Sequence, residues 1–187
     1  MKKISIVLLG LCFVLCGCGG YREIDRGYFV TAIAIFTQND TTTMLVEALS
    51  SSDVLEQENK KVVLCGCGDN TNQAFQNLKK TVVKPLYFEH IGVATFDKTT
   101  DEYISFLKEI PDISYGIYIV KTDDAKRLLE SESPNGVVGY DTVALIKNAE
   151  KEQDKNFYNR LYNIKNDKEL PTVNFDGKKL TLEMTGE

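Results

Sequence analysis

Strand-like and helix-like segments alternate through the middle of this 187-residue chain. Residues 61–66 are β-prone, residues 70–84 repeat apolar side chains at helical spacing, and residues 86–96 form the longest apolar strand-like run. Pro85 ends the helix because proline has no backbone N–H and clashes with the preceding turn. Two strands joined through a helix by about 18 residues predict a parallel pair with a right-handed connection.

Capping residues and prolines mark the ends of further helices. Asp69 or Asn70 can cap the first helix, and Thr99 or Thr100 can cap a second helix that Pro111 ends. The pattern then predicts a strand at 114–120, a helix at 125–131, a turn at 133–136 and a helix at 140–162.

Hairpin patterns flank this region. Residues 28–37 and 42–50 are β-prone and are separated by Asn39-Asp40, and the C-terminal segment 166–187 contains the turn pair Asp176-Gly177. The predicted fold class is therefore α/β (α+β), a mixed β-sheet with helices packed on it. One main domain at residues 28–165 would be followed by the C-terminal hairpin, which could be the remnant of a second domain.

The first residues have the three-part layout of a signal peptide. Lys2 and Lys3 precede an apolar run that ends in Leu15-Cys16-Gly17-Cys18. About 12 apolar residues make a helix of about 18 Å, too short for a hydrocarbon core of about 30 Å. The run ends like the lipobox that lipoprotein signal peptidase cuts, so we expect loss of residues 1–17 and a diacylglyceryl group on Cys18. A plain signal peptide is the alternative.

Residues 18–27 are expected to form a short tether on the lipid anchor. Two acyl chains hold a protein stably on a membrane, so no basic patch is needed. The charged segment with Arg22, Glu23 and Ile24 would lie next to the bilayer and is a candidate partner contact. The alternative is a solvated tether without a partner.

Composition limits the class of partner. The chain has 22 basic and 27 acidic side chains, and losing Lys2 and Lys3 with the leader would make the balance more acidic. Nucleic acid is therefore not expected as a partner, because its phosphates would be repelled. A hydrophobic content of 43% is enough for one domain with a sizeable core.

Cys65 and Cys67 would share one face of a strand, because side chains two residues apart point the same way. Unpaired cysteines are mostly buried, so we expect both to pack as small apolar residues. A local disulfide and a soft metal site are the alternatives.

No residue pattern supports catalysis. His90 is the single histidine, and Glu89 beside it would face the opposite side of a strand, which argues against a catalytic dyad. The turn from Gly66 to Asp69 weakly resembles a phosphate loop, yet Asp69 would place a negative charge where phosphate binds. We therefore predict that the chain is not an enzyme and needs no cofactor or metal.

Several local strings resemble the N-terminal domain of the Ger(x)C family, the lipoprotein C subunits of spore germinant receptors. The matching strings are Arg22-Glu23-Ile24 after the cysteine, Phe29 to Ile35, Cys65 to Leu78 at the strand-to-helix turn, and Leu86 to Val93 with its aromatic, x, His order. The resemblance covers roughly residues 15–148. The family's arginine-rich signature is reduced to Ile110-Pro111-Asp112, and full-length members continue through two further domains.

The resemblance implies a non-enzymatic, lipid-anchored subunit or accessory of a nutrient germinant receptor. Its expected partners are the polytopic A and B subunits, and its expected location is the extracytoplasmic face of the spore inner membrane. The alternative function is a stand-alone lipoprotein that binds a small ligand near the turn from Gly66 to Asp69.

Overall fold

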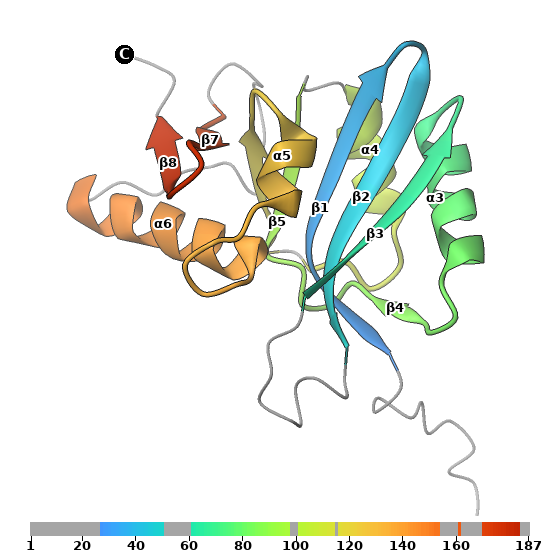
Figure 1. Ribbon diagram of the computed structural model, residues 1–187, viewed down its shortest axis with the longest axis horizontal. Coiled ribbons are helices and arrows are strands. Elements are labelled where there is room, and N and C mark those ends of the chain that lie inside the picture. Colours follow the sequence, from blue (N-terminus) through green and yellow to red (C-terminus); the bar gives the residue numbers. More distant parts are fainter. Residues whose placement is uncertain are drawn as a thin grey trace, which may run out of the picture.

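The computed structural model describes residues 27–50, 61–97, 101–114, 116–153, 161 and 170–183. These residues form a mixed sheet of eight strands with helices on both faces (Figure 1), which confirms the predicted fold class. The main path through the sheet runs β3-β2-β1-β5-β6-β7-β8, and β4 pairs separately with β1.

The first three strands form an antiparallel meander. β1 (Tyr28–Gln38) pairs with β2 (Thr41–Ser50), and β2 pairs with β3 (Lys61–Gly68). Asn39 and Asp40 connect β1 to β2 with φ angles of 50° and 59°. A two-residue turn with two positive φ angles matches the right-handed twist of the flanking strands, so the predicted hairpin is confirmed.

The helix after β3 begins where its capping residue predicts, but it ends at Thr81, before the end predicted at Pro85, because Val82 already has an extended backbone. In α3 (Thr71–Thr81) the Asn70 side chain accepts a hydrogen bond from the backbone N–H of Gln73, at 2.9 Å. Such a bond satisfies one of the N–H groups that have no partner within the helix. The prediction that Asp69 or Asn70 caps this helix is therefore confirmed for Asn70.

The predicted single strand at 86–96 is wrong, because the structure has two short strands there. β4 (Leu86–Tyr87) pairs with Tyr28 and Phe29, and β5 (Val93–Phe96) pairs with β1 from Ala32 onward. Only Val30 and Thr31 of β1 lie opposite residues 88–92, so the longer segment turns out of the sheet at Glu89 and His90. Apolar residues alone could not reveal this difference in length.

The strands before and after α3, β3 and β5, run parallel as predicted, but they are not neighbours in the sheet. β5 is parallel to β1, and β3 runs the same way because two antiparallel pairings separate it from β1. The strands β2 and β1 nevertheless lie between β3 and β5.

The remaining elements continue the alternation. They are α4 (Asp101–Glu109), β6 (Tyr118–Lys121), α5 (Ala125–Glu130), α6 (Val138–Gln153), β7 (Thr172–Phe175) and β8 (Leu180–Glu183). The predicted strand 114–120 is thus shorter at its start, and the helix predicted at 140–162 begins two residues earlier. Thr99, Thr100 and most residues after Gln153 in that predicted helix lie outside the described residues.

The C-terminal hairpin extends the main sheet. β7 pairs with β6 in parallel, through Lys121 and Thr172, and β8 pairs with β7 antiparallel. The described part of the hairpin is therefore the edge of the sheet that starts at β3.

Two apolar cores lie on opposite faces of the sheet. α3 and α4 cover one face, where Ile33, Ile35 and Met44 are buried, and α5 and α6 cover the other, where Ala32, Ala34 and Leu45 are buried. Alternation along the strands assigns neighbouring side chains to different cores. The register shift between Val30 and Ala32 resets this alternation, so Val30 and Ile33 share a core.

Candidate functional site

The described domain begins where the predicted tether ends. Cys18, Arg22, Glu23 and Ile24 lie outside the described residues, whereas Tyr28 is the first residue of β1. The backbone N–H of Tyr28 donates to the carbonyl oxygen of Pro85 at 2.9 Å. The loop between α3 and β4 is therefore fixed at the end of the domain where the N-terminal segment enters.

A groove of about 440 Å³, here called the β4 groove, lies at this end. Residues from α3, from the loop and strand β4 and from the turn after α4 line it. They are Phe75, Lys79, Val82, Val83, Lys84, Pro85, Leu86, Tyr87, Phe88, Glu89, Ile110, Pro111 and Asp112. A mainly apolar groove with some charged residues in its lining is a surface suited to binding another protein.

Val83 is the most exposed large apolar residue of the described part of the chain, with 99% of its surface accessible. It lies two residues after the end of α3, and the residue between them, Val82, has left the helical conformation. Lys84 next to it donates to the Ser50 hydroxyl at 2.9 Å, which attaches the loop to the end of β2. Val83 is thus held between the end of α3 on one side and the bonds of Lys84 and Pro85 on the other.

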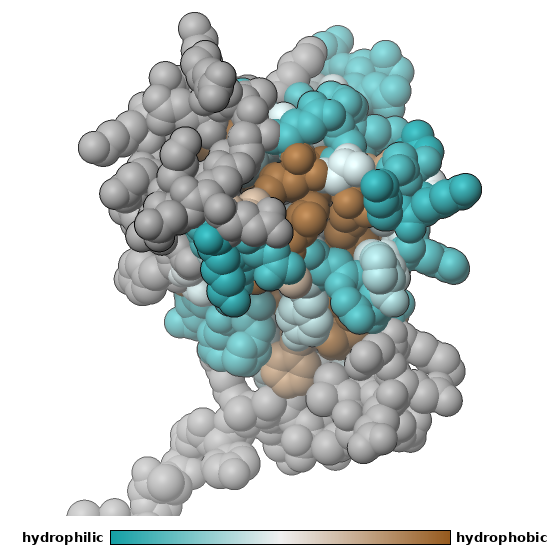
Figure 2. Space-filling model, turned by 90° about the vertical axis from the view of Figure 1, so that its left-hand side faces the viewer, coloured by the Kyte–Doolittle hydropathy of each residue, from teal (hydrophilic) through white to brown (hydrophobic). Residues whose placement is uncertain are grey.

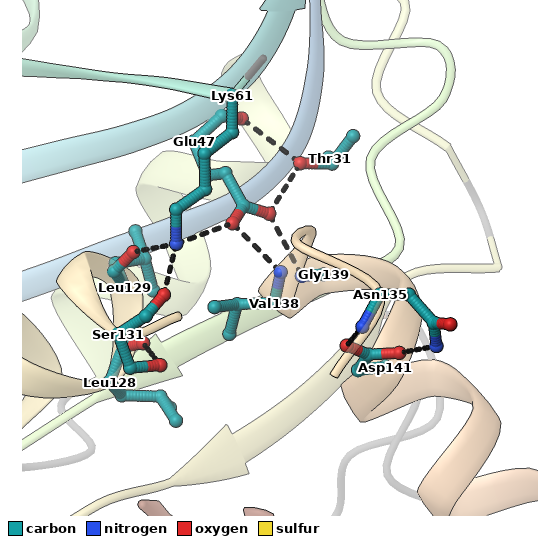
Figure 3. A network of polar contacts seen from close by, with 10 residues as sticks. All are labelled: Thr31, Glu47, Lys61, Leu128, Leu129, Ser131, Asn135, Val138, Gly139 and Asp141. Carbon is teal, nitrogen blue, oxygen red and sulfur yellow. Dashed lines mark hydrogen bonds and ion pairs between the residues drawn. The ribbon is translucent and has the colours of Figure 1, made fainter. Parts of the chain in front are cut away.

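A buried carboxylate that the sequence analysis missed joins the sheet to α6 (Figure 3). Glu47 on β2 is fully buried, and its carboxylate accepts from the backbone N–H groups of Val138 and Gly139 at 2.8 and 2.9 Å. These are the first residues of α6, where unpaired N–H groups and the helix dipole favour a negative charge. Thr31 donates a further hydrogen bond at 2.6 Å.

Lys61 supplies the countercharge to this carboxylate. Its Nζ lies 3.7 Å from Glu47 Oε2 and also donates to the carbonyl oxygens of Leu129 and Ser131 at the end of α5. The network therefore ties β1, β2 and β3 to the facing ends of α5 and α6 (Figure 3). Every charged group in it has a partner, so its role is to hold the two helices on the sheet.

Asp141 fixes the turn before α6 in a similar way. Its carboxylate accepts from the backbone N–H of Asn135 at 3.0 Å and from the Asn135 side chain. Partial burial raises the pKa of Asp141, but the neighbouring Ser133 and Asn135 outweigh burial and leave the pKa below its usual value. The charged form is thus the one that stabilises this turn, which confirms the turn predicted at 133–136.

The expectation that Cys65 and Cys67 pack in the core is wrong. Both are unpaired and exposed, with their sulfur atoms 3.8 Å apart. The residue between them, Gly66, is the one that faces α3. The cysteines therefore point to the opposite face of β3, at the end of the sheet.

The turn proposed for a small ligand is filled by helix α3. A Cβ atom on Gly66 would lie 2.3 Å from the Ala74 carbonyl oxygen, and one on Gly68 would lie 2.6 Å from the Ala74 backbone nitrogen. These glycines allow β3 to pack closely on α3. The β4 groove is not formed by this turn. A charged hollow of about 420 Å³ beside α5 is also separate from this turn.

His90 lies in the exposed turn between β4 and β5, where its ring contacts Phe29 edge-on at 5.8 Å between centroids. Within the described ranges, no cluster of three or more histidine, cysteine or acidic residues could hold a metal ion.

The side of the molecule that carries α6 and β8 has an apolar area with polar residues along part of its border (Figure 2). The partly buried apolar side chains of these two elements include Val143 on α6 and Leu180 and Leu182 on β8, and they pack against the second core. Across the described parts of the chain, no helix combines the length and apolar character needed to cross a bilayer.

Comparison with known proteins identifies one family. The model of the spore germination protein N-terminal domain matches residues 20–174, which is most of the chain. No curated protein and no solved structure gives a significant match. The match extends from before β1 into β7 and includes the helices on both faces of the sheet. The chain therefore belongs to the family of spore germination proteins defined by this N-terminal domain, which confirms the Ger(x)C resemblance.

Proposed function

We propose that this chain is a lipid-anchored, non-enzymatic subunit or accessory of a nutrient germinant receptor on the extracytoplasmic face of the spore inner membrane. The observation that carries the proposal is the family match, which begins at residue 20, directly after the lipobox-like Leu15-Cys16-Gly17-Cys18. A germination role follows from the family. The anchor, the receptor partners and the lack of catalysis are the proposed additions.

The position of the β4 groove supports a role close to the membrane. About ten residues separate Cys18 from Tyr28, and such a segment spans at most about 35 Å when extended. Two residues that line the groove contact Tyr28. Pro85 accepts its backbone hydrogen bond, and Leu86 pairs with it in the sheet. A domain anchored at Cys18 thus keeps this apolar surface within reach of a membrane-embedded partner, and we assign the groove, together with Arg22, Glu23 and Ile24, to contact with the polytopic A and B subunits.

The anchor is tested by changing Cys18→Ala in the producing organism. The variant lacks the thiol that receives the lipid, so we expect the chain to leave the membrane fraction and nutrient-triggered germination to be lost or strongly delayed. Immunoblots of membrane and soluble fractions and the fall in optical density of a spore suspension measure the two effects.

Cys16→Ala is the matched control, because it removes a neighbouring thiol while keeping a small residue before the cut. It should retain both membrane attachment and germination. A Cys18→Ala chain that stays with the membrane and supports normal germination would rule out the proposed anchor.

A further inference from the structure

The strongest unexplained feature of the described residues is a pair of exposed thiols on an edge strand. Cys65 and Cys67 have no role in the core, in the network around Glu47 or in the β4 groove. Their sulfur atoms lie 3.8 Å apart, within thiol hydrogen-bond distance, and the Thr43 hydroxyl lies 3.6 Å from the sulfur of Cys67. Neither sulfur needs to cross the strand to reach the other.

We propose that Cys65 and Cys67 form a reversible disulfide by exchange with a low-molecular-weight disulfide. Residues two apart on a strand are separated by about 6.6–6.8 Å between Cα atoms, and disulfides span about 4.4–6.8 Å. Closure is therefore feasible at the upper limit of the range. Rotation about the side-chain bonds, with a small shortening of the strand, brings the sulfur atoms from 3.8 Å to bonding distance.

Two features of the strand make this shortening feasible. β3 is the last strand of the sheet, paired only with β2, so its outer edge carries no further ladder of hydrogen bonds in the described structure. The residue between the cysteines is Gly66, and the backbone of glycine has more conformational freedom than that of any other residue type. The closed bond would be strained, and strained, exposed disulfides are easily reduced again.

The exchange balances with a small disulfide as the oxidant. The Cys67 thiol gives its proton to the buffer and its sulfur attacks one sulfur of the small disulfide. This forms a mixed disulfide on Cys67, breaks the S–S bond of the small disulfide and releases one small thiolate. Cys65 then gives its proton to the released small thiolate, and its sulfur attacks the Cys67 sulfur of the mixed disulfide, which forms the Cys65–Cys67 bond and releases the second small thiolate. Partial burial and the neighbouring Cys67 raise the pKa of Cys65 to about 11, so Cys65 keeps its proton at neutral pH and acts second.

The pair responds to the redox state of its surroundings whether or not the proposed receptor role is correct. An extracytoplasmic location would favour the oxidised form. Cys65 and Cys67 thus form a dithiol site that is oxidised by small disulfides such as oxidised glutathione.

The test uses the full chain, equilibrated in glutathione buffers from fully reduced to fully oxidised, acid-quenched and alkylated. Trypsin cleaves after Lys61 and Lys79, so Cys65 and Cys67 fall in one peptide that contains none of the other cysteines. In oxidising buffer we expect this peptide to be lighter by two hydrogen atoms and free of alkyl groups. Excess reduced glutathione should return it to the doubly alkylated form.

Cys65→Ser and Cys67→Ser are matched variants that keep one thiol each. Both should carry one glutathione and never the internal bond, and circular dichroism should show that both remain folded. A wild-type peptide with two glutathiones or two alkyl groups in oxidising buffer would overturn the proposal. An internal bond that excess reduced glutathione cannot open would overturn its reversibility.

Discussion

At the scale of single side chains, the sequence around Glu47 does not reveal that this carboxylate joins the sheet to α6. It stands between Val46 and Ala48 in the apolar run from Met44 to Leu49, and its main-chain donors are in α6, far along the chain. No local pattern could predict those donors. The available signal was a single acid among apolar strand residues, which usually requires a buried partner.

Changing Glu47→Ala should destabilise the fold by about 3–5 kcal/mol, because it leaves Lys61 without its countercharge and the first N–H groups of α6 without an acceptor. Thr31→Val, which removes only one donor to the same carboxylate, should cost about 1 kcal/mol. Urea unfolding followed by circular dichroism measures both.

Glu109→Ala is the control, because this acid is exposed at the end of α4 and its loss should change stability by less than about 0.5 kcal/mol. If Glu47→Ala unfolds at the same urea concentration as Glu109→Ala, the network does not hold α6 on the sheet.

At the scale of elements, local sequence patterns predicted most helices, strands and turns, whereas pairing between distant residues determined how these elements are arranged. The β1–β2 hairpin, the cap at Asn70 and the end of α4 before Pro111 depend on neighbouring residues, so they were predictable. The helix α3 ends at Thr81, earlier than the stop predicted at Pro85. The break within residues 86–96 depends on how many residues β1 offers opposite them. The exposure of Cys65 depends on which face of β3 the helices cover, and the sequence has no local signal for that.

The contact between β3 and α3 gives a test at this scale. Gly66→Ala would place a Cβ atom 2.3 Å from the Ala74 carbonyl oxygen and 2.5 Å from the Leu78 backbone nitrogen. Both are backbone atoms of the helix, so strand and helix must separate. We expect a loss of about 1–3 kcal/mol in unfolding free energy, as for other overpacked sites.

Cys65→Ala is the neighbouring control, since it changes an exposed position on the other face of the same strand and should cost less than about 0.5 kcal/mol. Equal thermal midpoints for Gly66→Ala and Cys65→Ala would show that β3 and α3 are not packed this closely.

At the scale of the whole molecule, the candidate site combines parts of the chain that the sequence analysis treated separately. The β4 groove brings the ends of α3 and α4 to the start of β1. The sequence predicted that both helices end near these residues but not that the two ends meet beside the start of β1. The contact residues predicted from the sequence, Arg22, Glu23 and Ile24, lie outside the described residues, so their role stays a prediction.

Val83→Ser tests the groove as the receptor contact. Burying a valine side chain contributes about 1.5 kcal/mol or more, so its loss should reduce capture of the receptor A and B subunits about tenfold. Pull-down from detergent-solubilised spore membranes measures the capture, and the membrane attachment of the variant should not change.

Tyr140→Ser is the matched control, because Tyr140 is the other large apolar residue exposed in the described structure and lies on α6. It should capture the subunits as well as the unaltered chain does. If Val83→Ser also captures them fully, the contact surface is elsewhere.

The place of β1 in the sheet has a mechanical consequence. The strand that follows the tether is an interior strand, bonded to β2 on one side and to β4 and β5 on the other. A force transmitted through the tether would therefore load two ladders of hydrogen bonds in shear at once and could not peel the domain open from an edge. With the proposed lipid anchor in place, attachment to an interior strand would let the folded domain bear tension between the membrane and a partner bound at its far side.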